Sequence, residues 1–177
     1  MSPIEKPSPF HASPGGGSSA RRKRTPPARQ LGDTIARLTI PRLETDLYVM
    51  EGDGSRELRL GPGHLQGTAM PGGNGNCIIA GHRDTHFRAL KDIRKGDEIV
   101  LTTHEGAYTY RVETIVVVSP GDTRTLRPTQ DAELHLVTCY PFHYLGSAPK
   151  RFIVEAHLEK SAAESTNVAE QAADSVK

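Results

Sequence analysis

The chain has 177 residues, a formal net charge of +1 and two cysteines. A net charge this close to zero excludes a strongly basic field, so no nucleic-acid partner is expected. Two cysteines form at most one disulfide, which is too few for a fold stapled by cysteines. No window approaches the roughly 18–20 apolar residues that span a bilayer, and the first residues lack the apolar core of a secretory signal.

Composition divides the chain into three parts. Residues 1–32 are rich in Pro, Gly, Ser and Arg and have few large apolar side chains, so they predict a disordered linker. The basic run at 21–24 is either a solvated spacer or a patch attracted to anionic lipid or wall polymer. Residues 33–158 have the size of one domain with a single core. Residues 159–177 lack a sustained apolar stripe and predict a polar, flexible tail.

The middle of the chain reads as short strands separated by turns. The expected strands are 35–40, 47–50, 77–80, 98–103, 107–118, 133–139 and 151–158. Two short helical segments are expected, a single turn at 58–60 and a helix at 87–93. Asp84 or Thr85 would cap the first turn of the second helix. Many short strands with few helices predict a mainly β fold, a closed or nearly closed barrel.

His82 directly follows the turn glycine after the apolar strand 77–80. It is therefore expected at the point where that strand ends. An imidazole titrates near neutrality and can both donate and accept a proton, as acyl transfer to an amine requires. The same position also suits a histidine with a purely structural hydrogen bond.

Cys139 lies two residues before Pro141, where strand pairing must stop because proline has no amide hydrogen to donate. The thiol is therefore expected at a strand end, held by the ladder behind it and open to the loop ahead. This placement suits a nucleophile. The alternative is a buried structural thiol, the commonest state of a free cysteine.

Arg151 begins the last expected strand, and the turn-rich segment 140–150 separates it from Cys139. If the two strands form a hairpin, the start of the second lies beside the end of the first. Arg151 would then be the neighbour of Cys139. Because arginine stays protonated, it would donate hydrogen bonds to a carbonyl or a developing oxyanion. A solvated arginine at a strand end is the alternative.

Three segments, in this order, resemble those of the sortase family, and most of all the class D sortases. The histidine segment is GHRDTHFR at 81–88, the cysteine segment is LVTCYPF at 136–142 and the arginine segment is APKRF at 148–152. Upstream, IARLTIP at 35–41 and GPGH followed by TAMPG within 61–72 also match. The ordered set, rather than any one segment, carries the resemblance over about residues 33–158.

The resemblance implies a single eight-stranded β-barrel with one or two short helices, in which His82, Cys139 and Arg151 converge. It implies a cysteine transpeptidase that cleaves an LPxTG-like sorting signal through a thioester on Cys139. His82 would transfer protons, and Arg151 would lie over the reacting carbonyl. The loops at 119–132 and 140–150 would form the walls of the groove.

The same resemblance implies three contacts to the substrate, from Thr138, Tyr140 and His135. The family's cysteine strand usually has a threonine where His135 stands, so the local packing differs from the family pattern. By the two-residue period of a strand, His135 shares a face with Val137 and Cys139. No role in the family is assigned to Cys77, and its apolar strand predicts a packed thiol.

Partners and location also follow from the resemblance alone. Substrate proteins would carry a C-terminal LPxTG-like signal, and the accepting amine would come from a peptidoglycan precursor or a pilin. No metal or other cofactor is expected, and the protein is expected to be a monomer. It would act at the extracytoplasmic face of the membrane in the cell envelope. Members of this class usually carry an N-terminal membrane anchor, which this sequence lacks.

Two other classes of function remain open. His82 and His86 are four residues apart, with His135 and Cys139 as further potential ligands, so a metal-dependent hydrolase is one. Arg83 stands where a zincin needs its glutamate, which weighs against that reading. A peptide-binding β-barrel without catalysis is the other.

Overall fold

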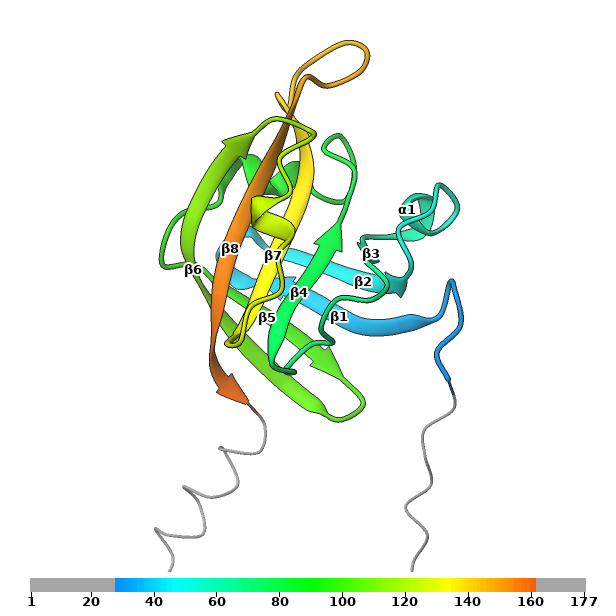
Figure 1. The fold of residues 1–177 in the computed structure, drawn as a ribbon, viewed down its shortest axis with the longest axis vertical. Coiled ribbons are helices and arrows are strands. Elements are labelled where there is room, and N and C mark those ends of the chain that lie inside the picture. Colours follow the sequence, from blue (N-terminus) through cyan, green and yellow to red (C-terminus); the bar gives the residue numbers. More distant parts are fainter. Residues whose placement is uncertain (1–27, 162–177) are drawn as a thin grey trace, which may run out of the picture.

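The structure, a computed structural model, describes residues 28–161. The predicted linker at 1–32 lies outside the described residues except for 28–32. The predicted tail at 159–177 does so except for 159–161, which belong to the last strand. The strands are β1 (Thr34–Ile40), β2 (Thr45–Glu51), β3 (Gly63–His64), β4 (Gly75–Ala80), β5 (Glu98–Thr103), β6 (Gly106–Val118), β7 (Ala132–Tyr140) and β8 (Lys150–Ser161). Within the described residues they close into one barrel in the order β1-β2-β3-β4-β7-β8-β6-β5 (Figure 1). The predicted eight-stranded barrel is confirmed.

The seven expected strands are all present, and most are one to three residues longer than expected. The eighth strand, β3, has only two residues. A segment this short shows no alternation of apolar and polar side chains, so the sequence could not reveal it. β3 pairs parallel to β2 and antiparallel to β4, and it thereby closes the barrel.

Strands β4 and β7 run parallel, with Ala80 opposite Val137. Strands β7 and β8 form the expected antiparallel hairpin. Because parallel strands end at the same edge of a sheet, the carboxyl ends of β4 and β7 meet at one end of the barrel. The β7–β8 loop (residues 141–149) extends beyond that same end, at the top of Figure 1.

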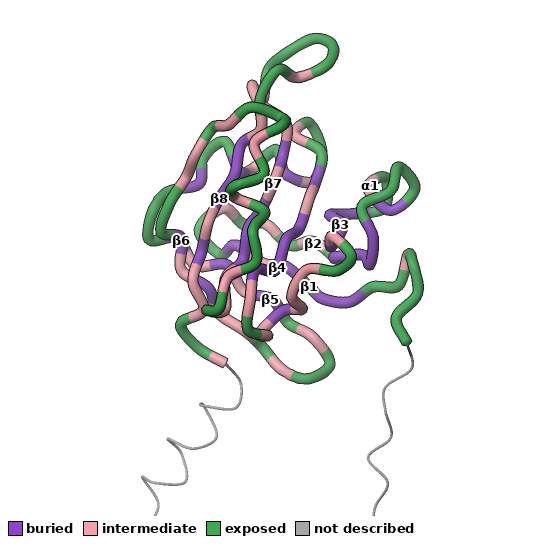
Figure 2. The backbone as a smooth tube through the Cα atoms, in the orientation of Figure 1, coloured by how far each residue is buried: buried purple, intermediate pink, exposed green. Residues whose placement is uncertain are grey.

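Apolar side chains fill the barrel interior, and the strand interiors are buried while most of the connecting loops are exposed (Figure 2). The largest fully buried side chain is Tyr110 of β6, whose hydroxyl accepts a hydrogen bond from the Gly72 amide at 2.7 Å. Strand β7 contributes Leu134 and Leu136 to this core. The core therefore holds rigid the strands whose ends carry the predicted site.

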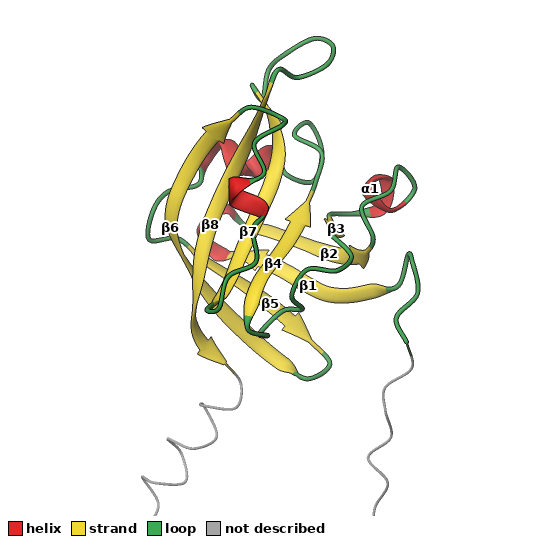
Figure 3. Ribbon diagram, viewed as in Figure 1, coloured by secondary structure: helices red, strands yellow, loops and turns green. Residues whose placement is uncertain are grey.

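The helical segments are all short, three to five residues each, and lie in the connections between strands (Figure 3). They are α1 (Glu57–Leu60) and the 3-10 segments η1 (Pro41–Leu43), η2 (Arg88–Asp92) and η3 (Arg124–Leu126). Within residues 28–161, no helix has the length and hydropathy that a membrane span requires.

The expectation of a helix capped by Asp84 or Thr85 is wrong. Segment η2 is a 3-10 helix whose N-cap is Phe87, and no side chain caps it. Phe87 is buried, and its amide donates to the His82 carbonyl at 3.0 Å. Burial of this ring draws the chain into tight turns directly after β4. Asp84 and Thr85 lie in these turns, before the helix begins, and so do not cap it.

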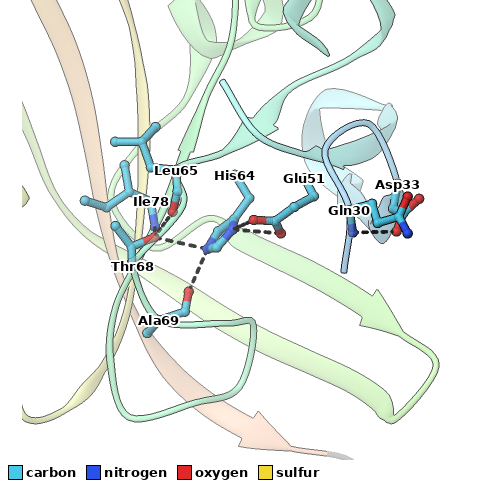
Figure 4. A network of polar contacts seen from close by, with 8 residues as sticks. All are labelled: Gln30, Asp33, Glu51, His64, Leu65, Thr68, Ala69 and Ile78. Carbon is cyan, nitrogen blue, oxygen red and sulfur yellow. Dashed lines mark hydrogen bonds and ion pairs between the residues drawn. The ribbon is translucent and has the colours of Figure 1, made fainter. Parts of the chain in front are cut away.

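A buried polar network joins β2, β3 and the segment before β4 (Figure 4). His64 Nε2 lies 3.0 Å from both the Ala69 carbonyl and the Thr68 hydroxyl, while the Thr68 hydroxyl donates to the Leu65 carbonyl at 2.7 Å. Nε2 therefore carries a hydrogen, because a carbonyl only accepts. Nδ1 lies 3.2 Å from the Glu51 carboxylate. This pairing compensates two buried polar side chains and fixes the two-residue strand β3.

Candidate active site

Cys139 is the penultimate residue of β7, and pairing ends after Tyr140, directly before Pro141, as expected. Leu134, Leu136 and Thr138 alternate along β7 and are buried. Cys139 has the opposite parity, so its side chain lies on the outer face of the barrel. The thiol is half-buried and free of any disulfide. It is anchored by the ladder and reachable from outside.

Arg151 is the register partner of Cys139 across the β7–β8 hairpin. The predicted neighbour relation is confirmed. Residues directly opposite in an antiparallel pair project to the same face, so the guanidinium and the thiol share the outer face. Nη1 of Arg151 donates to the carbonyls of Ala148 at 3.3 Å and Lys150 at 3.1 Å.

His82 is placed by hydrogen bonds that continue the β4–β7 pairing beyond the end of β4. The Gly81 amide donates to the Val137 carbonyl at 3.0 Å, and the Thr138 hydroxyl donates to the Gly81 carbonyl at 2.7 Å. Glycine is required at 81, since a Cβ there would lie 2.6 Å from the Phe87 ring. His82 therefore leaves the sheet directly beside the end of β7, and it is exposed.

One cavity of about 360 Å³ is lined by all three predicted catalytic residues. Its lining consists of His82, Arg83, Asp84, Cys139, Gly146, Ser147, Ala148 and Arg151. The strand ends of β4, β7 and β8 and the β7–β8 loop thus supply a thiol, an imidazole and a guanidinium to one space. A larger cavity of about 940 Å³ lies by the start of β1 and contains none of these three residues.

The three predicted substrate contacts do not line this cavity. Thr138 is buried, and its hydroxyl is committed to the Gly81 carbonyl. Tyr140 stacks on Phe152 with ring centroids 6.1 Å apart, and its edge meets Phe142. These two side chains support the site from behind, and their contact with a substrate stays a prediction.

His135 lies on the same outer face of β7 as Cys139, but it is covered by the β6–β7 loop (residues 119–131). Its Nδ1 donates to the Thr125 carbonyl at 2.6 Å, and Nε2 lies 3.3 Å from the Glu133 carboxylate. Asn76 of β4 donates to the same Thr125 carbonyl at 3.1 Å. The two side chains hold the loop against the sheet, and a direct role of His135 in substrate binding stays a prediction.

Sequence reasoning missed the contribution of Arg83 and Asp84 to the cavity. From the sequence, Arg83 was informative only as evidence against a zincin, which has glutamate at this position. No local pattern signals this contribution, because it depends on where the β7–β8 loop lies relative to the segment after β4.

The residues of the metal-site hypothesis do not share one cavity. His86 lines a separate hollow with Thr85 and Arg88, and His135 lies under the β6–β7 loop. Within residues 28–161, no group of three or more His, Cys, Asp or Glu side chains is arranged to hold a metal ion.

Cys77, the other thiol, is completely buried in β4, which confirms the prediction of a packed thiol. Burial, with the negative charge of Glu51 as a smaller cause, raises the pKa of this thiol to about 12. Since the thiolate is the reactive form, Cys77 is inert at neutral pH. Of the two thiols, both within the described residues, Cys139 is the accessible one.

Comparison with known proteins identifies the family. Residues 38–159 match the family model described as "Sortase domain". Sortase D of Bacillus subtilis is 36% identical over 126 residues, which cover 71% of this chain and 64% of that protein. The chain therefore spans less than two thirds of the length of this curated relative.

Solved structures agree with this match. A Sortase D5 transpeptidase of Clostridium perfringens has a TM-score of 0.69 at 34% identity, covering 75% of this chain and 82% of that one. Sortase A of Corynebacterium diphtheriae has a TM-score of 0.68 at 33% identity, covering 73% and 62% of the two chains. With the family model matching well over half of its length, the chain belongs to the sortase family.

Proposed function

We propose that the protein is a cysteine transpeptidase that cleaves an LPxTG-like sorting signal and transfers the acyl group to an amine. One observation carries the proposal. Cys139 and Arg151 are register partners at the end of the β7–β8 hairpin, and they line one cavity with His82 from the end of the neighbouring parallel strand. A nucleophile, a proton-transfer group and a carbonyl-binding cation together are what acyl transfer requires.

In the first half-reaction, the thiol of Cys139 gives its proton to His82, and its sulfur attacks the carbonyl carbon of the threonine in the signal. Hydrogen bonds from Arg151 stabilise the negative charge that develops on the carbonyl oxygen. His82 gives a proton to the departing amine, so the peptide bond breaks and a thioester forms. In the second half, His82 takes a proton from the incoming amine, which attacks the thioester and releases the sulfur.

The proposed partners follow the same chemistry. The acyl donor is a protein with a C-terminal LPxTG-like signal, and the acceptor is an amine of a peptidoglycan precursor or a pilin subunit. The proposed place of action is the extracytoplasmic face of the membrane, where sortases anchor proteins in the cell envelope. A C. perfringens relative is itself described as a transpeptidase, which supports the assignment of the reaction.

Trapping of the thioester tests the proposal. The protein is incubated with LPxTG-like and LPNTA-like peptides, and intact mass and peptide mapping locate any adduct. We expect an acyl adduct on Cys139 in the wild type, none in Cys139→Ala, and strongly slowed formation in His82→Ala. Added glycine peptide should remove the adduct and yield the ligated product. Peptide binding without any adduct would instead support a non-catalytic binding module.

A further inference from the structure

The β7–β8 loop forms one wall of the catalytic cavity. Phe142 packs its first residues against the core, but beyond Phe142 the loop has little apolar anchoring. Gly146, Ser147 and Ala148 line the cavity. Leu145 is 99% exposed and Tyr144 is 49% exposed. Burial of apolar side chains therefore does not fix the position of the loop beyond Phe142, so polar contacts must fix the part that lines the cavity.

Two arginines supply the hydrogen bonds that reach the loop from the described residues. Nη2 of Arg83 donates to the carbonyls of Tyr144 at 2.9 Å and Gly146 at 3.1 Å. Nη1 of Arg151 donates to the Ala148 carbonyl at 3.3 Å. Both arginines line the catalytic cavity, so the same hydrogen bonds fix the loop wall relative to the two guanidinium groups of the site.

Arg83 has a second contact with the loop. Its Cζ lies 5.8 Å from the centroid of the Tyr144 ring, within the range of a cation–π interaction. One planar guanidinium thus engages two carbonyls and a ring that lie 61 to 63 residues away in the chain. Lysine cannot reproduce this geometry, because its ammonium is a single point charge.

The sequence position of Arg83 gives these contacts a consequence for catalysis. Arg83 directly follows His82, whose backbone is fixed by the bonds of Gly81 to β7. The same short segment therefore carries the proton-transfer group on one residue and holds the opposite cavity wall with the next.

We propose that Arg83 is a positioning residue that fixes the β7–β8 loop as the wall of the acyl-binding cavity and so aligns the peptide with Cys139. The proposal rests on the proposed function for its effect on turnover, but its structural part does not. When the bound peptide carbonyl draws Arg151 away from the Ala148 carbonyl, Arg83 is the anchor that remains.

Two measurements on the full chain test this role. The first is amide hydrogen exchange of residues 141–149, and the second is kcat and KM for the LPxTG-like peptide. Arg83→Met should speed exchange in this loop and lower kcat/KM by about 10- to 100-fold, the range expected for hydrogen bonds of a charged group. Most of the loss should lie in KM, since Arg83 does not act on the reacting atoms. Arg83→Lys should recover part of both effects.

Arg59→Met is the matched control, because Arg59 also donates to a backbone carbonyl, that of Ser55 at 3.0 Å, but lies outside the cavity. It should leave loop exchange and kinetics unchanged.

Tyr144→Leu removes the ring contact while keeping both carbonyl bonds, and it provides a milder test if Arg83→Met does not fold. Unchanged loop exchange in the Arg83 variants, or faster exchange with unaltered kcat/KM, would overturn the proposal. A wild type that forms no thioester while Arg83→Met still loosens the loop would refute the proposed function alone.

Discussion

At the scale of single residues, the register pair Cys139 and Arg151 decides what the site can do. A thiol can be supplied at many strand ends, but only a side chain directly opposite brings a permanent cation to the same face. Neither side chain was informative alone, since a solvated arginine and a packed thiol are the ordinary states. The β7–β8 hairpin places the two side chains opposite each other, so that the thiol and the guanidinium act in one site.

We therefore expect Arg151→Lys to retain the fold and lose most of its turnover. The ammonium keeps the charge but cannot offer the two parallel donors of the guanidinium. Loss of an oxyanion donor typically lowers kcat by about 100- to 1000-fold. Steady-state kinetics with the LPxTG-like peptide, together with the thermal midpoint, would show whether turnover falls while stability stays.

The control is Arg88→Lys, because Arg88 is exposed and lies outside the cavity. It should leave kcat unchanged. Full activity in Arg151→Lys would show that charge alone is sufficient at this position and would remove the argument for the guanidinium.

At the scale of elements, a partly buried ion pair links η1 to the turn just before β5. Arg42 of η1 makes two hydrogen bonds with the carboxylate of Asp97, just before β5, at 2.5 and 2.6 Å. Asp97 is buried, and it also accepts a hydrogen bond from the Arg94 amide at 2.8 Å. Hydrogen bonding to the Arg42 guanidinium lowers the pKa of Asp97.

We expect Asp97→Asn to lower the free energy of unfolding at pH 7 by about 1–3 kcal/mol, because a buried charged donor–acceptor set is lost. A carboxylate with a lowered pKa contributes stability above its ordinary pKa and loses it as the pH falls. The difference between wild type and variant should therefore shrink on approach to pH 3. Urea unfolding at several pH values measures both effects.

The surface pair of Arg37 and Asp46 provides the control. About half of each side chain is exposed, so solvent screens the pair. Asp46→Asn should cost much less stability than Asp97→Asn. An equal loss in the two variants would mean that burial of Asp97 does not matter.

At the scale of the whole molecule, one core cluster includes both Cys77 and Tyr110, so their ionisation should affect the stability of the entire barrel. Burial raises the pKa of Cys77 to about 12 and also raises that of Tyr110. Well below the ordinary pKa of a thiol, about 9, Cys77 is neutral in both the folded and the unfolded chain. As the pH rises through that value, the thiol ionises in the unfolded chain but not in the folded one, so unfolding is increasingly favoured.

For Cys77 alone, this effect should reach about 2 kcal/mol at pH 10.5. Urea unfolding from pH 8 to 10.5 should show a stability that falls with pH. Cys77→Ala should be less stable at pH 8, because it leaves a small cavity, but its stability should fall less steeply. Identical slopes in the two proteins would show that Cys77 does not control the alkaline limit.

Much of this protein could be read from its sequence by itself. Many short strands separated by turns, with few helices, predicted a closed or nearly closed barrel. Pro141 predicted where β7 ends, because it lacks an amide hydrogen. The ordered histidine, cysteine and arginine segments predicted three of the residues that line the cavity. Each of these features depends on local chemistry or on the order of motifs.

Only the tertiary structure decided what depends on contacts between distant segments. The strand β3 exists because its neighbours and the His64 network hold two residues in place. His135, predicted beside the substrate, was found to hold the β6–β7 loop, and Arg83 was found to hold the β7–β8 loop. A side chain's partner across 61 residues follows from strand register and loop path, which no local pattern records.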